Sequence, residues 1–179
     1  MSAESRLDNA LGYADHGWLV LPLHSVQGGV CTCRKRSRCP NAGKHPRTRH
    51  GVKDATTNGK RVWEWWLRWP SANVGIATGT ESGVIVLDID PRNRGDGTFD
   101  GLLGRYGELP EGPVARTGGG GRHLLFRHPG ERVRGTLGPG IDVQGDGKLI
   151  VAPSSLHRTG RVYEWVIGPE HPLPGLPAA

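Results

Sequence analysis

Apolar residues occupy both faces of a short segment in the middle of the chain, where residues 84–91 read V-I-V-L-D-I-D-P. A run that is apolar on both faces is typical of a buried, central β-strand. Because side chains on a strand alternate between its faces, Asp88 and Asp90 should point to the same side. The pattern therefore predicts a buried strand that carries two neighbouring carboxylates at its end.

The remaining pattern predicts three helices and seven further strands, an α+β arrangement. One helix carries apolar residues from Leu7 and ends at Gly17, a second is capped by Thr57 and ends near Trp69, and a short third is capped by Thr98. The further strands are expected at residues 18–23, 73–77, 114–117, 122–127, 140–144, 148–152 and 161–167. Turns should make hairpins of 73–77 with 83–89, of 114–117 with 122–127, and of 140–144 with 148–152.

The second helix is rich in tryptophan. Val62, Trp65, Trp66 and Trp69 form its apolar face, and Trp63 lies off that face. Packing in the protein core is the favoured interpretation of this face. Stacking of nucleobases on the indole rings is the alternative.

Length and composition limit the class of protein. A chain of 179 residues can bury a core in one domain, and its 29 glycines, roughly twice the usual share of about 7%, indicate many tight turns. No segment has the roughly 20 apolar residues of a membrane helix, and residues 18–23 are too short and too late for a signal peptide. We expect a soluble, cytoplasmic protein with one domain over residues 1–168 and a Pro-rich tail or linker over residues 169–179.

The net charge of +6 comes entirely from the first third of the chain. Residues 1–53 hold nine Lys or Arg against three Asp or Glu, whereas the later residues hold fourteen of each. The densest basic block contains no acid and suits the phosphates of a polyanion, with a merely solvated loop as the alternative. The expected DNA contacts in this block are Arg34, Lys35, Arg36, Arg38, Lys44, Arg47 and Arg49.

All three cysteines of the chain lie within this block or just before it. Cys31, Cys33, Cys39 and His45 are separated by one, five and five residues. Three thiolates and one imidazole are a usual tetrahedral set for structural Zn²⁺, which would hold a loop that has no core of its own. Three free thiols beside a surface histidine are the alternative, although clustered thiols on a basic loop would be reactive.

Three aspartates are candidates for a second metal site. Asp88 and Asp90 would repel each other on one strand face unless a cation lies between them, and Mg²⁺ or Mn²⁺ prefers such oxygen ligands. Asp142 lies between Ile141 and Val143 in a short central strand, where a buried acid is costly unless it is paired, so it would supply a third ligand. The alternatives are that the first pair ends a strand in solvent and that Asp142 is an ordinary hydrogen-bonded strand residue.

Four glycines, Gly118 to Gly121, separate the next two strands and are followed by Arg122 and His123. Glycine lets backbone N–H groups approach an anion closely, and arginine and histidine can hold phosphate oxygens. This turn is therefore a candidate triphosphate site, and a structural role for the histidine is the alternative.

These motifs together resemble the prim-pol (bifunctional DNA primase/polymerase) branch of the archaeo-eukaryotic primase superfamily. D-I-D, G-G-G-R-H and I-D-V occur in order, each on its own expected strand. A-L-G-Y-A-D-H-G-W-L-V-L-P-L, the C-x-C segment ending in G-K-H-P, W-E-W-W before N-V-G-I-A-T-G, and V-A-P-S-S before Y-E-W also fit. The resemblance covers residues 7–165. It implies a primase-like core, with an RRM-like palm sheet and flanking helices, plus an N-terminal α/β unit into which the zinc-binding loop of residues 31–50 is inserted.

The resemblance also implies roles for individual residues. Asp88, Asp90 and Asp142 would hold the catalytic Mg²⁺ or Mn²⁺, and His123 would contact the phosphates of the incoming nucleotide. The rest of the nucleotide pocket would consist of Thr117, Gly118, Gly119, Arg122 and Ser155. This chain has P-S-S where a second proline is common, which weakens the assignment of Ser155. It has Lys148 where glycine is frequent, which adds a candidate phosphate contact.

The implied activity is template-directed nucleotidyl transfer by a two-metal mechanism during replication of a plasmid, phage or mobile element. The implied partners are a single-stranded DNA template, NTP or dNTP, and a helicase domain or protein. A catalytically inactive nucleic-acid-binding module that supports a helicase or initiator is the first alternative. A metal-dependent phosphohydrolase is the second, although it has no need of a glycine-rich triphosphate turn.

Overall fold

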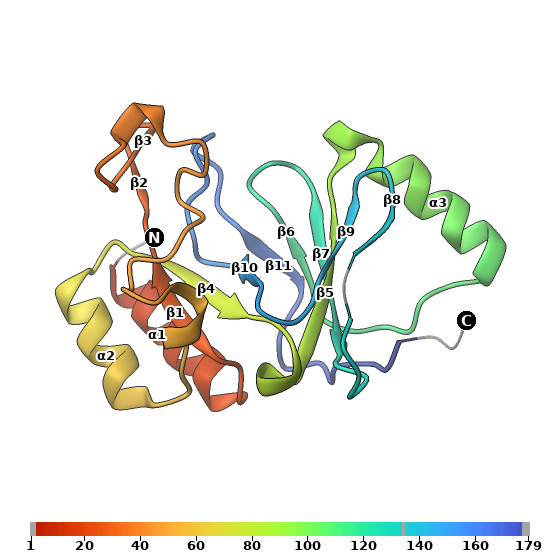
Figure 1. The fold of residues 1–179 in the computed structure, drawn as a ribbon, viewed down its shortest axis with the longest axis horizontal. Coiled ribbons are helices and arrows are strands. Elements are labelled where there is room, and N and C mark those ends of the chain that lie inside the picture. The colour runs from red at the N-terminus through yellow and green to blue at the C-terminus, as the bar shows by residue number, and fades with distance from the viewer. Residues whose placement is uncertain (1–2, 134, 177–179) are drawn as a thin grey trace.

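The computed structural model describes residues 3–133 and 135–176, which form α-helices and antiparallel sheets (Figure 1). The α-helices in this part of the chain are α1 (Ala3–Asp15), α2 (Gly59–Arg68) and α3 (Gly95–Tyr106). Its strands are β1 (Val20–Leu23), β2 (Val26–Gln27), β3 (Val30–Cys31), β4 (Asn73–Ala77), β5 (Val84–Ile89), β6 (Val114–Arg116), β7 (Arg122–Arg127), β8 (Thr136–Gly138), β9 (Ile141–Gln144), β10 (Leu149–Val151) and β11 (Glu164–Ile167). The mixture of helices and sheets agrees with the predicted fold class.

The N-terminal part is a three-stranded sheet, in the order β1-β4-β10, with α1 and α2 packed on it. Tyr13 of α1, Trp66 of α2 and Ile76 of β4 are each at most 2% exposed and belong to one core. The indole N–H of Trp66 donates to the carbonyl oxygen of Ala72 at 3.3 Å. Core packing is therefore confirmed for Trp66, whereas Trp63, off the apolar face, is 48% exposed.

The second part is a six-stranded sheet in the order β11-β6-β7-β5-β9-β8, with α3 against one face (Figure 1). Ile85 and Leu87 of β5 pack with Phe99 of α3 on that face. Val84 and Val86 face the other way and join the core of the N-terminal part. Strand β5 is thus buried on both faces, as its sequence predicts. Asp88 lies near the carboxyl end of the strand, and Asp90 directly follows it.

The cysteine-containing loop lies between β1 and α2. Its only regular elements are the two-residue strands β2 and β3 and two 3₁₀ turns, η1 (Arg36–Arg38) and η2 (Gly51–Asp54). In Figure 1, β2 and β3 project away from the three-stranded sheet. The small core of this loop consists of Val26, Ala42 and the three cysteines.

Two of the three predicted hairpins are wrong. Strand β4 pairs with β1 and β10, whereas β5 pairs with β7 and β9, so the chain changes sheets between β4 and β5 and again between β9 and β10. The two crossings are bonded to each other, because Thr78 Oγ1 donates to the Gly145 carbonyl at 2.7 Å and Thr80 Oγ1 donates to Asp146 Oδ1 at 2.8 Å. Segments that are apolar on both faces do not reveal which sheet they join. The hairpin of β6 with β7 is confirmed.

Two predicted helix caps are also corrected. The side chain of Asn58, rather than Thr57, accepts from the Arg61 N–H at 3.0 Å at the start of α2. Helix α3 begins at Gly95, so Thr98 lies within the helix, and its hydroxyl donates to the Pro139 carbonyl at 2.7 Å. Only glycine fits at the start of α3, since a Cβ there would lie 2.6–2.8 Å from backbone atoms of Asp90 and Gly140.

The Pro-rich segment that was expected to be a tail or linker packs against the domain as far as residue 176. The Arg127 N–H donates to the Pro174 carbonyl at 2.8 Å. Leu173 contacts the N-terminal core, and Leu176 contacts the core beneath α3. Within the described ranges, no helix has the length and apolar character needed to span a bilayer.

Candidate active site and metal centre

Three residues of the expected site lie side by side on neighbouring strands of the six-stranded sheet. Asp88 on β5 is directly opposite His123 on β7 and directly opposite Asp142 on β9. Residues directly opposite each other on antiparallel strands point to the same face, with Cβ atoms about 4.5–5.5 Å apart. The strand register therefore places a histidine on one side of Asp88 and a second acid on the other.

Asp142 differs from its expected environment. It is exposed, because the alternation along β9 turns Ile141 and Val143 into the core beneath α3 and leaves Asp142 on the opposite face. The expectation that Asp142 is a buried acid is wrong. Its position beside Asp88 is nevertheless the one required if Asp88, Asp90 and Asp142 are to hold metal ions together. Asp142 can therefore take a cation without paying for its own burial.

The electrostatic environment of Asp88 disfavours its negative charge. Its side chain is 35% exposed, and its pKa is raised to about 6, chiefly by burial and further by the charges of Asp142 and Asp90. The positive charge of Lys44 and a hydrogen bond from Gln144 act in the opposite direction. A carboxylate in this environment is stabilised by any cation that binds beside it.

Asp90 already has cationic and polar partners. Arg92 donates from Nε to Asp90 Oδ1 at 3.0 Å and from Nη2 to Oδ2 at 2.8 Å, and Asn93 Nδ2 donates to Oδ2 at 3.1 Å. The side-chain hydrogen bonds of Arg92 are the main reason that the pKa of Asp90 lies below its usual value. The oxygens of Asp90 therefore have to leave Arg92 before they can bind a metal ion.

His123 is buried and neutral at physiological pH. It is 5% exposed, and burial lowers its pKa to about 4, with a further contribution from Lys44. Its Nε2 lies 3.6 Å from Asp88 Oδ1, which is too long for a strong hydrogen bond. Its Nδ1 is buried and has no partner within the described part of the chain. A buried ring nitrogen without a partner is consistent with a site that a ligand completes.

A small pocket of about 70 Å³ is lined by Asp88, Asp90 and His123, whereas Asp142 is not among its lining residues. That volume is enough for about two water molecules, so it suits ions and single phosphate oxygens better than a whole nucleotide. The residues that line it are Lys44, Asp88, Ile89, Asp90, Arg92, Thr117, Gly119, Gly121, His123 and Tyr163.

The glycine turn between β6 and β7 forms one wall of this pocket. Thr117 closes the turn, because its Oγ1 accepts from the Gly121 N–H at 2.9 Å and its own N–H donates to the Gly121 carbonyl at 2.8 Å. A Cβ at Gly118 would overlap His157, and a Cβ at Gly121 would overlap the Ile89 carbonyl. The glycines are thus required for close packing, which brings Thr117 and Gly119 to the pocket.

Four residues expected in the nucleotide pocket do not line it, and Gly118 of the glycine turn is one of them. Arg122 points to the α3 face, where its Nη2 donates to Asp96 Oδ1 at 2.8 Å, because alternation on β7 separates it from His123. Ser155 is fully buried, and its Oγ accepts from the Val74 N–H at 2.9 Å, so it holds β4 in place. Lys148 is exposed between β9 and β10, and its ammonium donates to the Val143 carbonyl at 3.4 Å.

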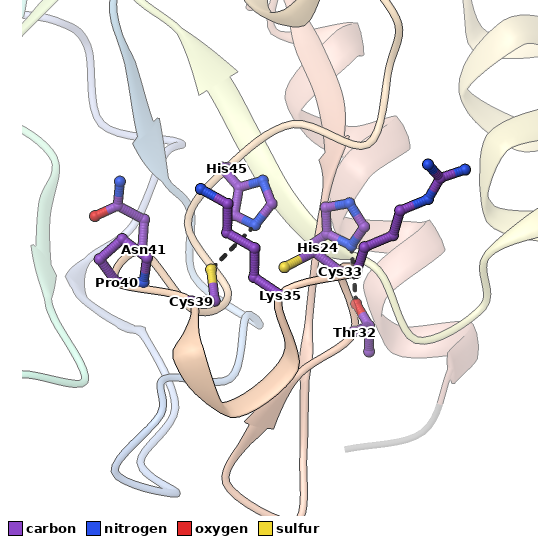
Figure 2. Close-up of a pocket in the computed structure, with 9 residues that line it drawn as sticks. His24, Thr32, Cys33, Lys35, Cys39, Pro40, Asn41 and His45 are labelled. Carbon is purple, nitrogen blue, oxygen red and sulfur yellow. Dashed lines mark hydrogen bonds between the residues drawn. The ribbon is translucent and has the colours of Figure 1, made fainter.

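The four residues proposed for zinc do converge. Ligand atoms of Cys31, Cys33, Cys39 and His45 all lie within 4.8 Å of one another, and His45 Nε2 is 3.6 Å from the Cys31 sulfur and 3.5 Å from the Cys39 sulfur. Figure 2 shows the Cys39 thiol joined to the His45 ring. Three buried thiols and one imidazole at these separations fit tetrahedral Zn²⁺ with bonds of about 2.0–2.3 Å. In the described residues the carboxylates are not gathered into a comparably close set.

The basic residues of the loop fall into three groups. Arg47 is partly buried, donates from Nη2 to Thr32 Oγ1 at 2.9 Å and lies over the ring of Trp69 at 5.5 Å, so it helps to hold the loop. Lys44 lines the acidic pocket. The others are exposed and available to a polyanion, and they are Arg34, Lys35, Arg36, Arg38 and Arg49.

Residues 10–179 match the family described as bifunctional DNA primase/polymerase, N-terminal (Prim-Pol). This chain belongs to the Prim-Pol family. The match covers nearly the whole chain and confirms the resemblance that the linked motifs indicated. A comparison with curated proteins finds no match. Membership implies nucleotidyl transfer of the primase/polymerase type, with DNA and nucleotides as substrates.

Within this Prim-Pol domain, three pocket residues were not predicted for the active site. Arg92 follows Asp90 by two positions in a polar loop, which is a weak signal. Tyr163 precedes β11, and its ring centre is 6.2 Å from that of His123, a proximity that no local pattern reveals. Lys44 was grouped with the DNA contacts because it lies in the basic block, and only the folded loop brings it to the acids.

Proposed function

We propose that this chain is a DNA-dependent primase/polymerase that performs template-directed nucleotidyl transfer with two divalent cations. The observation that carries the proposal is the register of β7, β5 and β9, which aligns His123, Asp88 and Asp142 across one face of the sheet. Asp90 lies at the end of the same strand as Asp88 and lines the same pocket. Nucleotidyl transfer requires positioning and charge stabilisation rather than a nucleophilic side chain, and these residues supply both.

Asp88, Asp90 and Asp142 are the residues that would hold Mg²⁺ or Mn²⁺. Such cations, when bound in a pair, lower the pKa of the attacking 3′-hydroxyl and neutralise the leaving pyrophosphate. The raised pKa of Asp88 supports this assignment, because its carboxylate lacks a close cationic partner of its own. Neutral His123, with an unpartnered ring nitrogen, is suited to hydrogen-bond a phosphate oxygen.

Arg92 would exchange partners when the site fills. Its guanidinium holds Asp90 and also lies near the glycine turn, with Nη2 3.8 Å from the position that a Cβ on Gly119 would take. If Asp90 held a cation, its hydrogen bonds with Arg92 would be lost, and the guanidinium would remain beside the turn. Arginine binds phosphate oxygens in a bidentate manner, so the released side chain is well placed for the triphosphate.

The exposed basic residues of the zinc-binding loop would hold a single-stranded template by its phosphates. Such contacts position a strand without reading its sequence. The loop emerges from the N-terminal sheet, whereas the acids belong to the six-stranded sheet, so template and nucleotide would be held by different parts of the domain (Figure 1).

The deciding experiment measures incorporation of labelled NTP or dNTP on single-stranded DNA, with and without a primer, in Mg²⁺ or Mn²⁺. We expect synthesis by the wild-type protein and a loss of at least about 100-fold in Asp88→Ala, since the charges that stabilise the transition state are lost. Asp100→Ala, an exposed acid on α3, is the matched control and should be unaffected. Near-normal synthesis by Asp88→Ala would remove the active-site assignment. Template binding without synthesis by the wild-type protein would favour the inactive binding module.

A further inference from the structure

We propose that Lys44 contacts the phosphates of the incoming nucleotide, and that the zinc cluster holds it in position to do so. The inference rests on the proposed function and adds a second task for the zinc-binding loop. Lys44 lies directly before His45, one of the four cluster residues, and its side chain lines the pocket of Asp88, Asp90 and His123. One short segment thus joins the zinc cluster to the acidic pocket.

The cationic side chains of this pocket differ in their partners. The pocket has two cationic side chains, Lys44 and Arg92. Arg92 is engaged with Asp90, whereas Lys44 has no ion pair within 4.0 Å to an acid of residues 3–133 or 135–176. The ammonium is therefore available to an anion that enters the pocket.

The backbone on both sides of Lys44 is held firmly. On one side, Asn73 of β4 donates from Nδ2 to the Gly43 carbonyl at 2.9 Å. Gly43 has φ +79°, and a Cβ there would lie 2.9 Å from Val26 Cγ2, so no other residue fits without displacement. On the other side, the His24 N–H donates to the His45 carbonyl at 2.8 Å. The lysine therefore starts from a fixed point between β1, β4 and the cluster.

Asn73 also ties this segment to the far side of the pocket. Its Nδ2 donates to the Leu156 carbonyl at 2.9 Å, and its Oδ1 accepts from the Leu156 N–H at 2.9 Å. The next residue, His157, packs against Gly118 of the glycine turn and lies 5.9 Å from the ring of Tyr163. A single buried asparagine thus connects the lysine-bearing segment with the elements that support the pocket wall.

The chemistry of the pocket favours a nucleotide triphosphate over the template backbone as the partner of Lys44. A phosphate that reaches this lysine also comes close to Asp88 and Asp90, which line the same pocket, and only metal-bound phosphate has the cations to offset that repulsion. Lysine is a mobile point charge with three donors, which suits phosphate oxygens that change position during transfer. The exposed arginines of the loop belong to a block, residues 34–49, whose sequence contains no acid, and they remain the proposed template contacts.

The test compares nucleotide and DNA affinity in the same variants, using a fluorescent dATP analogue with Mg²⁺ and a labelled single-stranded oligonucleotide. Lys44→Ala should weaken nucleotide binding about 10-fold or more, because a charge-assisted hydrogen bond contributes roughly 1.5–3 kcal/mol, and should leave DNA affinity within about twofold. Lys44→Arg should retain most of the nucleotide affinity. Lys60→Ala, an exposed lysine on α2, is the control, and Lys35→Ala should weaken DNA binding alone.

Zinc removal provides the second arm. Removal of zinc by a zinc-selective chelator, with Mg²⁺ kept constant, should weaken nucleotide binding by the wild-type protein about as much as Lys44→Ala does. The same treatment should cause little further loss in Lys44→Ala, because both changes act through one contact. Independent, additive losses would overturn the link to zinc. Normal nucleotide affinity with reduced DNA affinity in Lys44→Ala would make it a template residue and overturn the inference. A wild-type protein that binds no nucleotide would instead overturn the proposed function and this inference together.

Discussion

The acidic pocket and the zinc-binding loop hold mutually repelling side chains in place by different means. Each brings together groups that repel one another or are costly to bury: Asp88 and Asp90, with Asp142 opposite Asp88 on β9, in one case, and three thiols with a dense basic block in the other. In the pocket, the ladder of hydrogen bonds between β5, β7 and β9 fixes the positions of the side chains. In the loop, the two-residue strands provide no such framework, and the ligand set itself is the core.

The difference predicts how each region responds when its metal is lost. The register of the six-stranded sheet depends on apolar packing on both faces, so the pocket keeps its shape without a cation. The loop has a core of five small residues, too little apolar surface to order it alone. We therefore expect that the pocket folds without its metal ions, whereas the loop needs zinc in order to fold.

The largest effect should follow from breaking the zinc cluster. Structural zinc contributes about 10–16 kcal/mol of apparent binding free energy in small zinc-dependent folds, so Cys39→Ser should unfold the loop. We expect stoichiometric zinc in the wild-type protein by elemental analysis, at least about a 10-fold loss of DNA affinity in the variant, and rapid proteolysis within residues 31–50. Circular dichroism should show that the sheets persist.

Thiols of the wild-type protein that titrate fully, with no zinc found, would refute the cluster. Ser37→Ala, on the same loop and exposed, is the matched control and should retain zinc and resist proteolysis.

A smaller and more selective effect is expected for His123→Ala. The imidazole lies opposite Asp88 in the acidic pocket, which the exposed arginines of the loop do not line, so nucleotide affinity should fall about 10-fold, the equivalent of roughly 1.4 kcal/mol, while template affinity changes less than twofold. His171→Ala, an exposed histidine outside the pocket, serves as the control. The reverse ranking of the two affinities would contradict the role of His123.

The exposed arginines should show their effect in salt dependence. A protein that neutralises single-strand phosphates has a slope of log affinity against log salt of about −0.7 for each contact. Arg34→Ala and Arg38→Ala combined should therefore reduce the magnitude of the slope by about 1.4, with unchanged nucleotide affinity. A slope equal to that of the wild-type protein would show that these residues are merely solvated. Arg105→Ala, on α3, is the control.

The smallest effect concerns stability. The pKa of Asp88 is raised to about 6 by burial and then by Asp142 and Asp90, whereas the unfolded carboxyl titrates near its ordinary 3.8. The native state therefore loses stability as pH rises from about 4 to about 6, and the full penalty is present above pH 6. Asp88→Asn should raise the melting temperature by a few degrees at pH 7, without added Mg²⁺ or Mn²⁺, and should have no such effect near pH 3.5. Asp100→Asn should not reproduce this pattern, and a lower melting temperature for Asp88→Asn at pH 7 would contradict it.

The sequence by itself determined those features that depend only on residues close together in the chain. The apolar run of β5, the hairpin of β6 with β7, the tryptophan face of α2 and the zinc ligands all follow from spacing, because alternation, periodicity and ligand chemistry act over a few residues. The linked motifs also identified the family, which the match over residues 10–179 confirms. That Asp88, His123 and Asp142 share one face depends on the register of β7, β5 and β9, which alternation along each single strand does not fix.

Only the tertiary structure decided which strands share a sheet and which side chains meet. In the folded protein, β10 and β9 belong to different sheets, and Arg122 binds Asp96 of α3. Ser155 is buried against β4, and Lys44 lies in the pocket with Asp88 and Asp90. The local sequence of a segment that is apolar on both faces suits either of two sheets equally well. A loop has no periodic pattern from which its path could be predicted. Those choices depend on contacts between residues far apart in sequence, so no local pattern records them.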